Sequence, residues 1–369
     1  MKIKSIETFP LALPMRTPIK MARQLIDKAL TILVKIETDE GISGFGETAA
    51  AIAFSGETLA SLKFAIDKHI APALIGMDPF DIALINLIMD KMMAQNQGAK
   101  AAVDIALYDI VGKALGVPVY KLLGGRVRED VRITWHVANG NYDQDLETTA
   151  EGLALGYEVY KLKVGVASIE KELKTLEGIR KRFGGIDLRL DANQGLTQTT
   201  AIPFIKRTQD FDITFFEQPL DHRYLAGMAK ICAAVDVPIA ADEGIFTAYD
   251  VVANYEAKAA DIISLKLLKA GGLTGALAAA QLCYTFGFPI QMTSKIAETS
   301  VATAAAVHMG VSMAQVDYDC GTTNHFLADD IVEQPLLPER GRIRPFEKPG
   351  LGVDVSDEKL ALYTIKSLL

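Results

Sequence analysis

Short apolar runs alternate with amphipathic helical stretches along the chain from about residue 130 to residue 320. The runs end roughly 25 residues apart, a length suited to one strand, one helix and two short loops. Eight evenly spaced units predict a parallel (β/α) barrel. An open doubly wound sheet uses the same units, but eight even repeats close more naturally. The predicted strands cover residues 132–137, 157–164, 186–191, 213–218, 237–242, 261–266, 288–293 and 314–319.

The first part of the chain follows a different pattern. Up to about residue 60, alternating polar and apolar positions rich in Val, Ile and Thr predict strands joined by a hairpin at "TDEG". Between residues 57 and 116 the apolar residues recur with helical spacing. We therefore expect an α+β capping domain that precedes a modified barrel. The expected boundaries are residues 1–128 for the cap, completed by residues 326–369, and residues 129–325 for the barrel.

Composition narrows the possible functions. The 369 residues carry a formal net charge of −8, which argues against nucleic acid as the main partner because phosphate binding needs a basic surface. An anionic small molecule held by a few lysines stays compatible with that charge. The three cysteines show no paired metal-ligand spacing, and no apolar run reaches the length of a membrane span. We expect a cytoplasmic protein that binds neither nucleic acid nor a membrane.

Charged residues stand at the ends of five successive predicted strands. The carboxyl ends of barrel strands form the active-site face, and a charge directly after an apolar run is costly unless it is paired or used. Three acids on successive strands, flanked by lysines, are difficult to assign to packing. These residues are Lys161 and Lys163 on the second strand, Asp191 on the third, Glu217 on the fourth, Asp242 on the fifth and Lys266 on the sixth.

The three acids predict a metal site. Adjacent strands lie about 4.8 Å apart, so carboxylates at one level of neighbouring strands converge on a single cation. Oxygen ligands with open positions favour Mg²⁺, with Mn²⁺ as a substitute, whereas zinc usually requires His or Cys.

The lysines have a chemical interpretation beside such a metal. Lys161 and Lys163 point to the same side of a strand, which a solvated structural surface would also allow. Lys163 and Lys266 would flank the α-carbon of a substrate carboxylate. Removing its weakly acidic α-proton forms an enediolate, which a divalent cation stabilises. Lys161 would lower the pKa of Lys163, so that Lys163 can act as a base near neutral pH.

Several segments resemble motifs of the enolase superfamily and, more narrowly, of its muconate lactonizing subgroup. They are "AKAAVDIALYDIVGKALGVPVYKLLGG" (99–125), "YKLKVG", "LRLDANQG", "FFEQPL", "IAADEG" and "SLKLLKAGGL", in the family's order. The resemblance implies an isomerase of small-molecule carboxylates, a homo-oligomer, and an early loop over residues 15–25 that closes the barrel mouth. It implies Asp191, Glu217 and Asp242 as Mg²⁺ ligands, Lys163 and Lys266 as the acid/base pair, and Lys161 as an auxiliary cation.

The residues after strands seven and eight bear on the reaction, because members of this subgroup differ there. Asp317 and Asp319 resemble the D-x-D motif with which dipeptide epimerases hold a free ammonium group; a solvated acidic turn is the alternative. Glu298 resembles the glutamate expected after strand seven, although "MTSKIAETS" departs from the family pattern and adds Lys295. His136 is either a substrate contact or a structural histidine.

Asn193 and Glu243 are expected to support the metal ligands and Lys266 through hydrogen bonds. The favoured function is racemisation or epimerisation of an amino acid derivative or dipeptide through α-proton abstraction. The alternative is a muconate-type cycloisomerase or another lyase of the same subgroup, in which one lysine is the base and the other provides charge only. A non-catalytic barrel is a third interpretation, which the intact set of six charged strand-end residues argues against.

Overall fold

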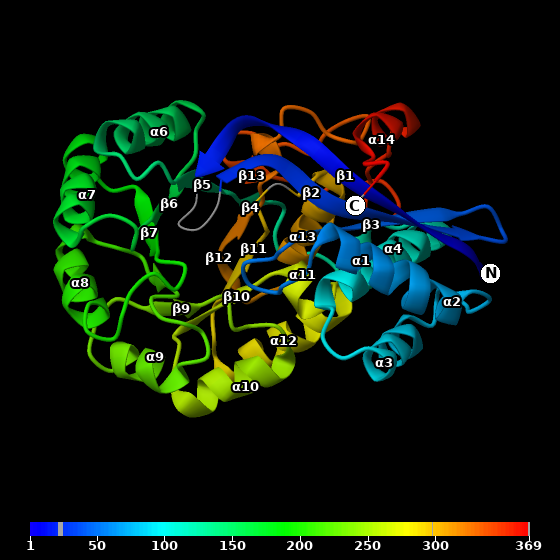
Figure 1. The fold of residues 1–369 in the computed structure, drawn as a ribbon, viewed down its shortest axis with the longest axis horizontal. Helices are drawn as coiled ribbons and strands as arrows, with labels where there is room; N and C mark the ends of the chain where they lie inside the picture. Colours follow the sequence, from blue (N-terminus) through cyan, green and yellow to red (C-terminus); the bar gives the residue numbers. More distant parts are fainter. Residues whose placement is uncertain (21–24, 297, 368–369) are drawn as a thin grey trace.

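A computed structural model of the chain describes residues 1–20, 25–296 and 298–367. Within these residues the strands form three sheets, one of three, one of eight and one of two strands. The N-terminal strands and helices form one body beside the eight-stranded sheet with its surrounding helices (Figure 1). No helix among the described residues is long and apolar enough to cross a membrane.

The N-terminal sheet confirms the predicted alternating strands. Its members are β1 (Ile3–Lys20), β2 (Leu25–Thr38) and β3 (Ser43–Ala49), paired antiparallel in that order. The turn between β2 and β3 is the predicted "TDEG" hairpin. The segment expected as an early loop, residues 15–25, is strand up to Lys20 and again from Leu25; residues 21–24 lie outside the described part.

Helices pack on one face of this sheet and fix its position. They are α1 (Leu59–Ala65), the π-helix η1 (Ile66–Ile70), α2 (Ala71–Leu74), α3 (Ile82–Met92), α4 (Gln97–Leu115) and α5 (Val119–Leu122). Helix α4 approaches β3 so closely that a Cβ at Gly46 would lie 1.9 Å from the carbonyl oxygen of Ala102. Only glycine fits there, so this residue sets the distance between helix and sheet.

The eight-stranded sheet forms the predicted parallel barrel. After the short strand β4 (Val131–Arg132), which pairs with β13 (Arg342–Ile343), its strands follow one another in chain order around the ring. A parallel bridge between Ile133 and Cys320 links the first and last strands. The barrel strands are β5 (Thr134–Val137), β6 (Val159–Lys163), β7 (Asp187–Asp191), β8 (Phe216–Glu217), β9 (Ile239–Ala241), β10 (Ile262–Leu265), β11 (Ile290–Thr293) and β12 (Val316–Gly321).

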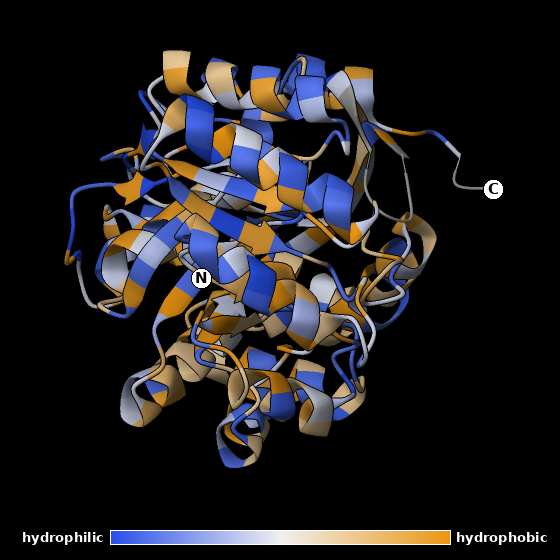
Figure 2. Ribbon diagram, turned by 90° about the vertical axis from the view of Figure 1, so that its left-hand side faces the viewer, coloured by the Kyte–Doolittle hydropathy of each residue, from blue (hydrophilic) through white to orange (hydrophobic). Residues whose placement is uncertain are grey.

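Helices surround the barrel, and their hydrophilic and hydrophobic residues alternate on the outer surface (Figure 2). Such alternation places one apolar stripe on the strands and leaves the polar face in water. The longer helices are α6 (Tyr142–Ala154), α7 (Ile169–Phe183), α8 (Ala201–Thr208), α9 (Leu225–Cys232), α10 (Ala248–Ala257), α12 (Leu273–Phe286) and α13 (Ser300–Ser312). The shorter ones are α11 (Leu267–Ala270), η2 (Gln209–Phe211) and η3 (Asn324–Phe326), whereas α14 (Asp357–Tyr363) packs on β1 of the N-terminal sheet.

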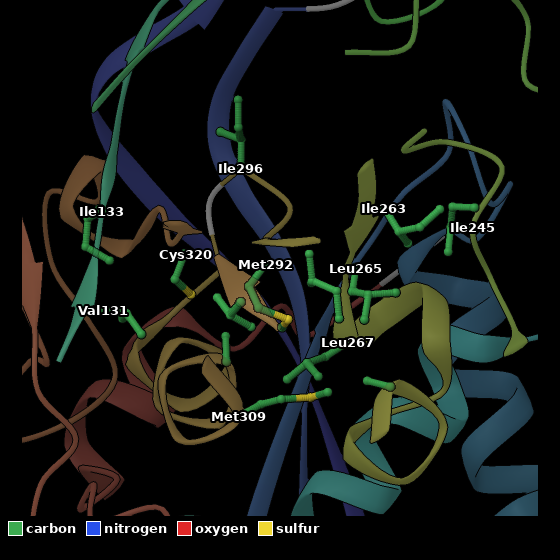
Figure 3. Packing of buried hydrophobic residues seen from close by; sticks show 14 of the residues in the cluster. Val131, Ile133, Ile245, Ile263, Leu265, Leu267, Met292, Ile296, Met309 and Cys320 are labelled. Carbon is green, nitrogen blue, oxygen red and sulfur yellow. The ribbon is translucent and has the colours of Figure 1, made fainter. Parts of the chain in front are cut away.

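The apolar core lies between the strands and these helices. Alternate residues of β10 and β11, among them Ile263, Leu265 and Met292, belong to it; Met292 lies on the side of Met309 of α13, and Ile263 lies beside Ile245 (Figure 3). Because successive side chains of a strand point to opposite faces, the residues between them face the barrel interior. In that interior Phe215 belongs to an apolar cluster at one end, where the guanidinium carbon of Arg189 lies 4.9 Å from its ring centroid, and the lysine–carboxylate pairs lie at the other end.

The C-terminal segment returns to the first sheet. Antiparallel bridges join Leu11 to Thr364 and Met15 to Leu327. The chain end therefore lies beside β1, in the region where the sequence predicts that residues 326–369 complete the cap. The exact domain boundaries stay predictions.

Candidate active site

Three acidic side chains meet at the carboxyl ends of adjacent barrel strands. Asp191 ends β7, Glu217 ends β8, and Asp242 directly follows β9. Asp191 and Glu217 are register partners, and all three residues are at most 2% exposed. They line one cavity together with Glu243, so four carboxyl groups share a site of about 110 Å³.

The predicted lysines lie in the same cavity, each next to one of these acids. Lys161 donates to Glu217 Oε2 at 2.6 Å, and Lys163 donates to Asp191 Oδ2 at 2.5 Å. Lys266 forms a short contact with Asp242 Oδ2. The structure therefore brings together all six charged strand-end residues that the sequence singles out.

Burial and mutual repulsion act on the protonation of these acids. Burial, followed by the neighbouring charge of Asp191, raises the pKa of Glu217 to about 7. Burial and the charge of Asp242 likewise raise the pKa of Glu243 to about 7. Burial also opposes ionisation of Asp242, but Lys266 and Lys269 outweigh it and hold its pKa well below the usual range. Glu217 and Glu243 thus ionise less readily than free glutamates because they are buried and other carboxylates crowd them. Additional positive charge among these groups would favour their ionised forms.

The donor set fits a hard divalent cation. All the acidic groups offer oxygen, and the described residues lining this cavity include no cysteine, which together favours Mg²⁺ or Mn²⁺ over zinc. Within the described part of the chain no three acids, histidines or cysteines stand in a metal-ligating cluster, and lysine ammonium groups contact the carboxylates of Glu217, Asp191 and Asp242. A cation bound here would neutralise the carboxylates in place of those ammonium groups. The lysines could then interact with a substrate.

Lys269 is part of the site, and the sequence analysis missed it. It belongs to α11, one helical turn after Lys266, and its side chain is fully buried. Its ammonium group donates to Asp242 Oδ1 at 2.7 Å and also contacts the Asp242 carbonyl oxygen. A lysine within the otherwise apolar stretch "LLKAGG" was the available signal.

The polar neighbours of the lysines take the positions expected for supporting residues. Asn193 accepts from Lys163 Nζ at 2.7 Å and donates to Glu243 Oε1 at 3.0 Å. It thereby links one lysine to the fourth carboxyl group. His136 of β5 lines the same cavity, and neither of its ring nitrogens has a hydrogen-bond partner in the described structure. Burial, Lys161 and Lys163 lower the pKa of His136 well below its usual value, so the ring is neutral.

Asp317 and Asp319 do not reach this cavity, so the prediction that both face the site is wrong. Strand β12 continues to Gly321, and its pairing with β11 contains a register shift that inserts extra residues before Cys320. Gly321 therefore occupies the level of the site. Asp319 lies buried deeper in the barrel against Arg189, and Asp317 is exposed.

We expect Asp319→Asn to lower stability and to leave substrate affinity unchanged. The substitution removes a charged partner of the fully buried Arg189, which keeps Asp187 at 3.0 Å. Loss of the charged partner of this buried ion pair should lower the free energy of unfolding by about 1.5–3 kcal/mol, measurable by urea unfolding. Asp317→Asn is the matched control and should change the free energy of unfolding by no more than about 0.5 kcal/mol. A selective loss of turnover on substrates with a free amine would contradict this placement.

Glu298 also lies outside the cavity lining, among the described residues. It is 5% exposed, and burial together with the charge of Glu47 raises its pKa to about 8. Its carboxyl group is engaged by the Ser294 hydroxyl and by the backbone of Lys295. Direct substrate contact by Glu298 thus has no support in the geometry, whereas Lys295 itself lines the cavity.

Comparisons with known proteins agree with this geometry. The family model "Mandelate racemase / muconate lactonizing enzyme, N-terminal domain" matches residues 4–124, and "Enolase C-terminal domain-like" matches residues 145–359. The N-succinyl-L-Arg/Lys racemase of Bacillus cereus is 33% identical over 99% of this chain and 98% of its own length.

Two solved structures illustrate the range of relatives. The muconate lactonizing enzyme of Pseudomonas fluorescens, complexed with muconolactone, superposes with a TM-score of 0.96 at 30% identity and covers 99% of both chains. The dipeptide epimerase of Cytophaga hutchinsonii, complexed with Mg and the dipeptide D-Ala-L-Val, has a TM-score of 0.94 at 28% identity over 98% of both chains. The chain therefore belongs to the mandelate racemase/muconate lactonizing enzyme family of the enolase superfamily and is an isomerase.

Proposed function

We propose that this isomerase removes the α-proton of a carboxylate substrate and returns a proton on the opposite face, as a racemase or epimerase of an amino acid derivative. One observation carries the proposal. Lys163 ends β6 and Lys266 directly follows β10, and these two strands are four apart in a ring of eight and hence on opposite sides of the barrel. The acids on β7, β8 and β9 lie between them, so two bases approach one bound carboxylate from two faces.

Asp191, Glu217 and Asp242 are the proposed ligands of Mg²⁺, for which Mn²⁺ can substitute. When bound, the cation stabilises the negative charge that develops on the substrate carboxylate as its α-proton leaves. Lys161 adds a fixed positive charge beside Glu217, and Lys269 holds the Asp242 carboxylate in place by donating a hydrogen bond to its Oδ1. Asn193 orients the Lys163 ammonium group, and neutral His136 offers its ring nitrogens to the substrate.

The substrate class follows from two supporting facts. A relative of similar length is a racemase of N-succinylated amino acids, and another relative was solved with Mg and a dipeptide. Because Asp317 and Asp319 do not face the cavity, the feature expected to bind a free ammonium group is absent among the described residues. An N-acylated amino acid is therefore preferred over a dipeptide.

A cycloisomerase is the second candidate, and the close superposition on a muconate lactonizing enzyme favours it. In that reaction one lysine works as the acid or base and the other supplies charge only. A cytoplasmic location and assembly into a homo-oligomer are further proposals, supported by the family alone.

Deuterium exchange separates these functions. Incubation with N-acylamino acids, proline derivatives or dipeptides in D₂O with Mg²⁺ should give solvent deuterium at Cα of both the recovered substrate and its epimer for the substrate class that the enzyme accepts, and muconate is tested in parallel for lactone formation. NMR follows the label, and chiral chromatography follows the epimer. Lactone formation from muconate, with no labelled epimer from any amino acid derivative, would replace the first candidate by the second.

A further inference from the structure

Lys295 presents a positive charge to the cavity from the side opposite the first metal-ligand strand. It follows the end of β11, which is four strands from β7 in the ring of eight. Together with Thr293, Ser294 and the neighbouring Ile296, which is labelled in Figure 3, it lines the cavity that contains the six strand-end residues. A substrate whose reacting carboxylate lies near β7–β9 therefore extends toward Lys295.

The charge of Lys295 differs from the other lysine charges of the cavity because it is not matched. The ammonium groups of Lys161, Lys163, Lys266 and Lys269 each contact a carboxylate. Within the described structure no carboxylate oxygen lies within the 4.0 Å ion-pair distance of Lys295 Nζ. Burial, and after it the repulsion of Lys266 and Lys163, lowers the pKa of Lys295 to about 8 despite the charge of Glu298. An unmatched, largely buried cation in a cavity is a binding site for an anion.

Glu298 is the nearest rival partner of Lys295. Its carboxyl group, however, is taken up by the Ser294 hydroxyl and the Lys295 backbone, and it does not line the cavity among the described residues. The Lys295 carbonyl is in turn held by a 2.8 Å hydrogen bond from Thr323 Oγ1. The turn is thus fixed through its backbone, and Lys295 is the residue of this turn that brings a charge to the cavity lining.

We propose that Lys295 determines specificity by binding a second anionic group of the substrate, so that the preferred substrates are carboxylates with another carboxylate at their distal end. This inference rests on the proposed function and specifies its substrate class. N-succinyl amino acids and dicarboxylic acids both carry such a group. The contact is one charge-assisted hydrogen bond, made in addition to the interactions of the reacting carboxylate.

A matched pair of minimal ligands tests the proposal. N-succinylglycine carries the distal carboxylate, and N-succinamoylglycine replaces it with an uncharged amide of nearly the same shape; neither has a side chain that could clash. Binding is measured by calorimetry with Mg²⁺ present, and exchange of the glycine α-protons in D₂O is measured separately. The proteins are the wild type, Lys295→Met, Lys295→Arg and Glu298→Gln.

The wild type should bind and exchange the succinyl compound at least about tenfold better than the amide. Lys295→Met should remove this preference because it weakens the succinyl compound much more than the amide, while Lys295→Arg and Glu298→Gln should retain it. Equal losses on both ligands in Lys295→Met, no preference in the wild type, loss of the preference in Glu298→Gln, or no binding of either ligand would overturn the assignment. If binding shows the preference but neither ligand exchanges, Lys295 stands and the proposed proton abstraction fails.

Discussion

Glu217→Gln is expected to abolish both the stabilisation by Mg²⁺ and the α-proton exchange. Glu217 lies between the other two proposed ligands at the end of β8 and is 1% exposed. Replacing a charged oxygen ligand by a neutral amide removes several kcal/mol of electrostatic stabilisation, so exchange should fall by at least about a thousandfold.

The apo stability of this variant should change little, because two effects oppose each other. Lys161 loses its carboxylate partner at 2.6 Å, which is unfavourable for a buried ammonium group. Burial raises the pKa of Glu217, and its charge repels Asp191 and Asp242. Removing that charge is therefore favourable for the fold and offsets the loss of the Lys161 ion pair. The fold should therefore survive, and the loss of activity can be assigned to the site.

Thermal unfolding with and without Mg²⁺ provides the measurement. The wild type should gain stability in proportion to the logarithm of the Mg²⁺ concentration above Kd, about 2.7 kcal/mol at one hundred times Kd. Glu217→Gln should show no gain. Glu47→Gln is the matched control, since Glu47 is a buried carboxylate bonded to Thr299 and Ala302 and should keep the response to Mg²⁺. An unchanged response in Glu217→Gln would exclude this carboxylate as a ligand.

The sequence was sufficient to predict the barrel and the six charged residues at the ends of five of its strands. Short apolar runs that recur about every 25 residues identify the strands, and in a parallel barrel the ends of successive strands meet at one face, so Asp191, Glu217 and Lys266 could be grouped without coordinates. The structure brings these residues together in one cavity.

The same reasoning failed at the last strand for a physical reason. A register shift adds residues to β12 opposite β11, and such a shift leaves no mark in a hydrophobic pattern. Asp319 consequently falls one layer too deep, where it pairs with Arg189, a residue two positions before the proposed ligand Asp191. Spacing within one strand could not show this, because the outcome depends on pairing with its neighbour.

Other features depend on tertiary contacts from the start. Lys269 resembles an ordinary helical lysine in sequence, and only the packing of α11 beneath Asp242 gives it a partner. Likewise, only the three-dimensional arrangement shows that Lys295 lacks, among the described residues, the carboxylate partner that the other lysines of the cavity have. Both lysines are identified by pairing the positive and negative side chains around the cavity, and sequence motifs do not reveal them.

Lys163→Ala and Lys266→Ala are expected to divide the reaction by stereochemistry. Each ammonium group reaches the site from one side of the barrel, so each lysine serves one face of the α-carbon. A positioned acid/base group contributes about 10²–10⁴-fold, and each variant should lose exchange of one enantiomer by that factor. Exchange of the other enantiomer, which needs only the remaining lysine, should persist within about tenfold.

The measurement uses both enantiomers of an N-acylamino acid that the wild type exchanges, each incubated in D₂O with Mg²⁺ and followed by NMR. Retained Mg²⁺ stabilisation controls for damage to the ligands: in Lys266→Ala the buried Lys269 still contacts Asp242, and in Lys163→Ala the backbone N–H of Asn193 still donates to Asp191 Oδ1 at 2.8 Å. Equal loss of both exchanges in both variants, with Mg²⁺ still bound, would exclude two bases. Complete loss in one variant and little change in the other would instead identify a single working lysine, which is the arrangement expected of a cycloisomerase.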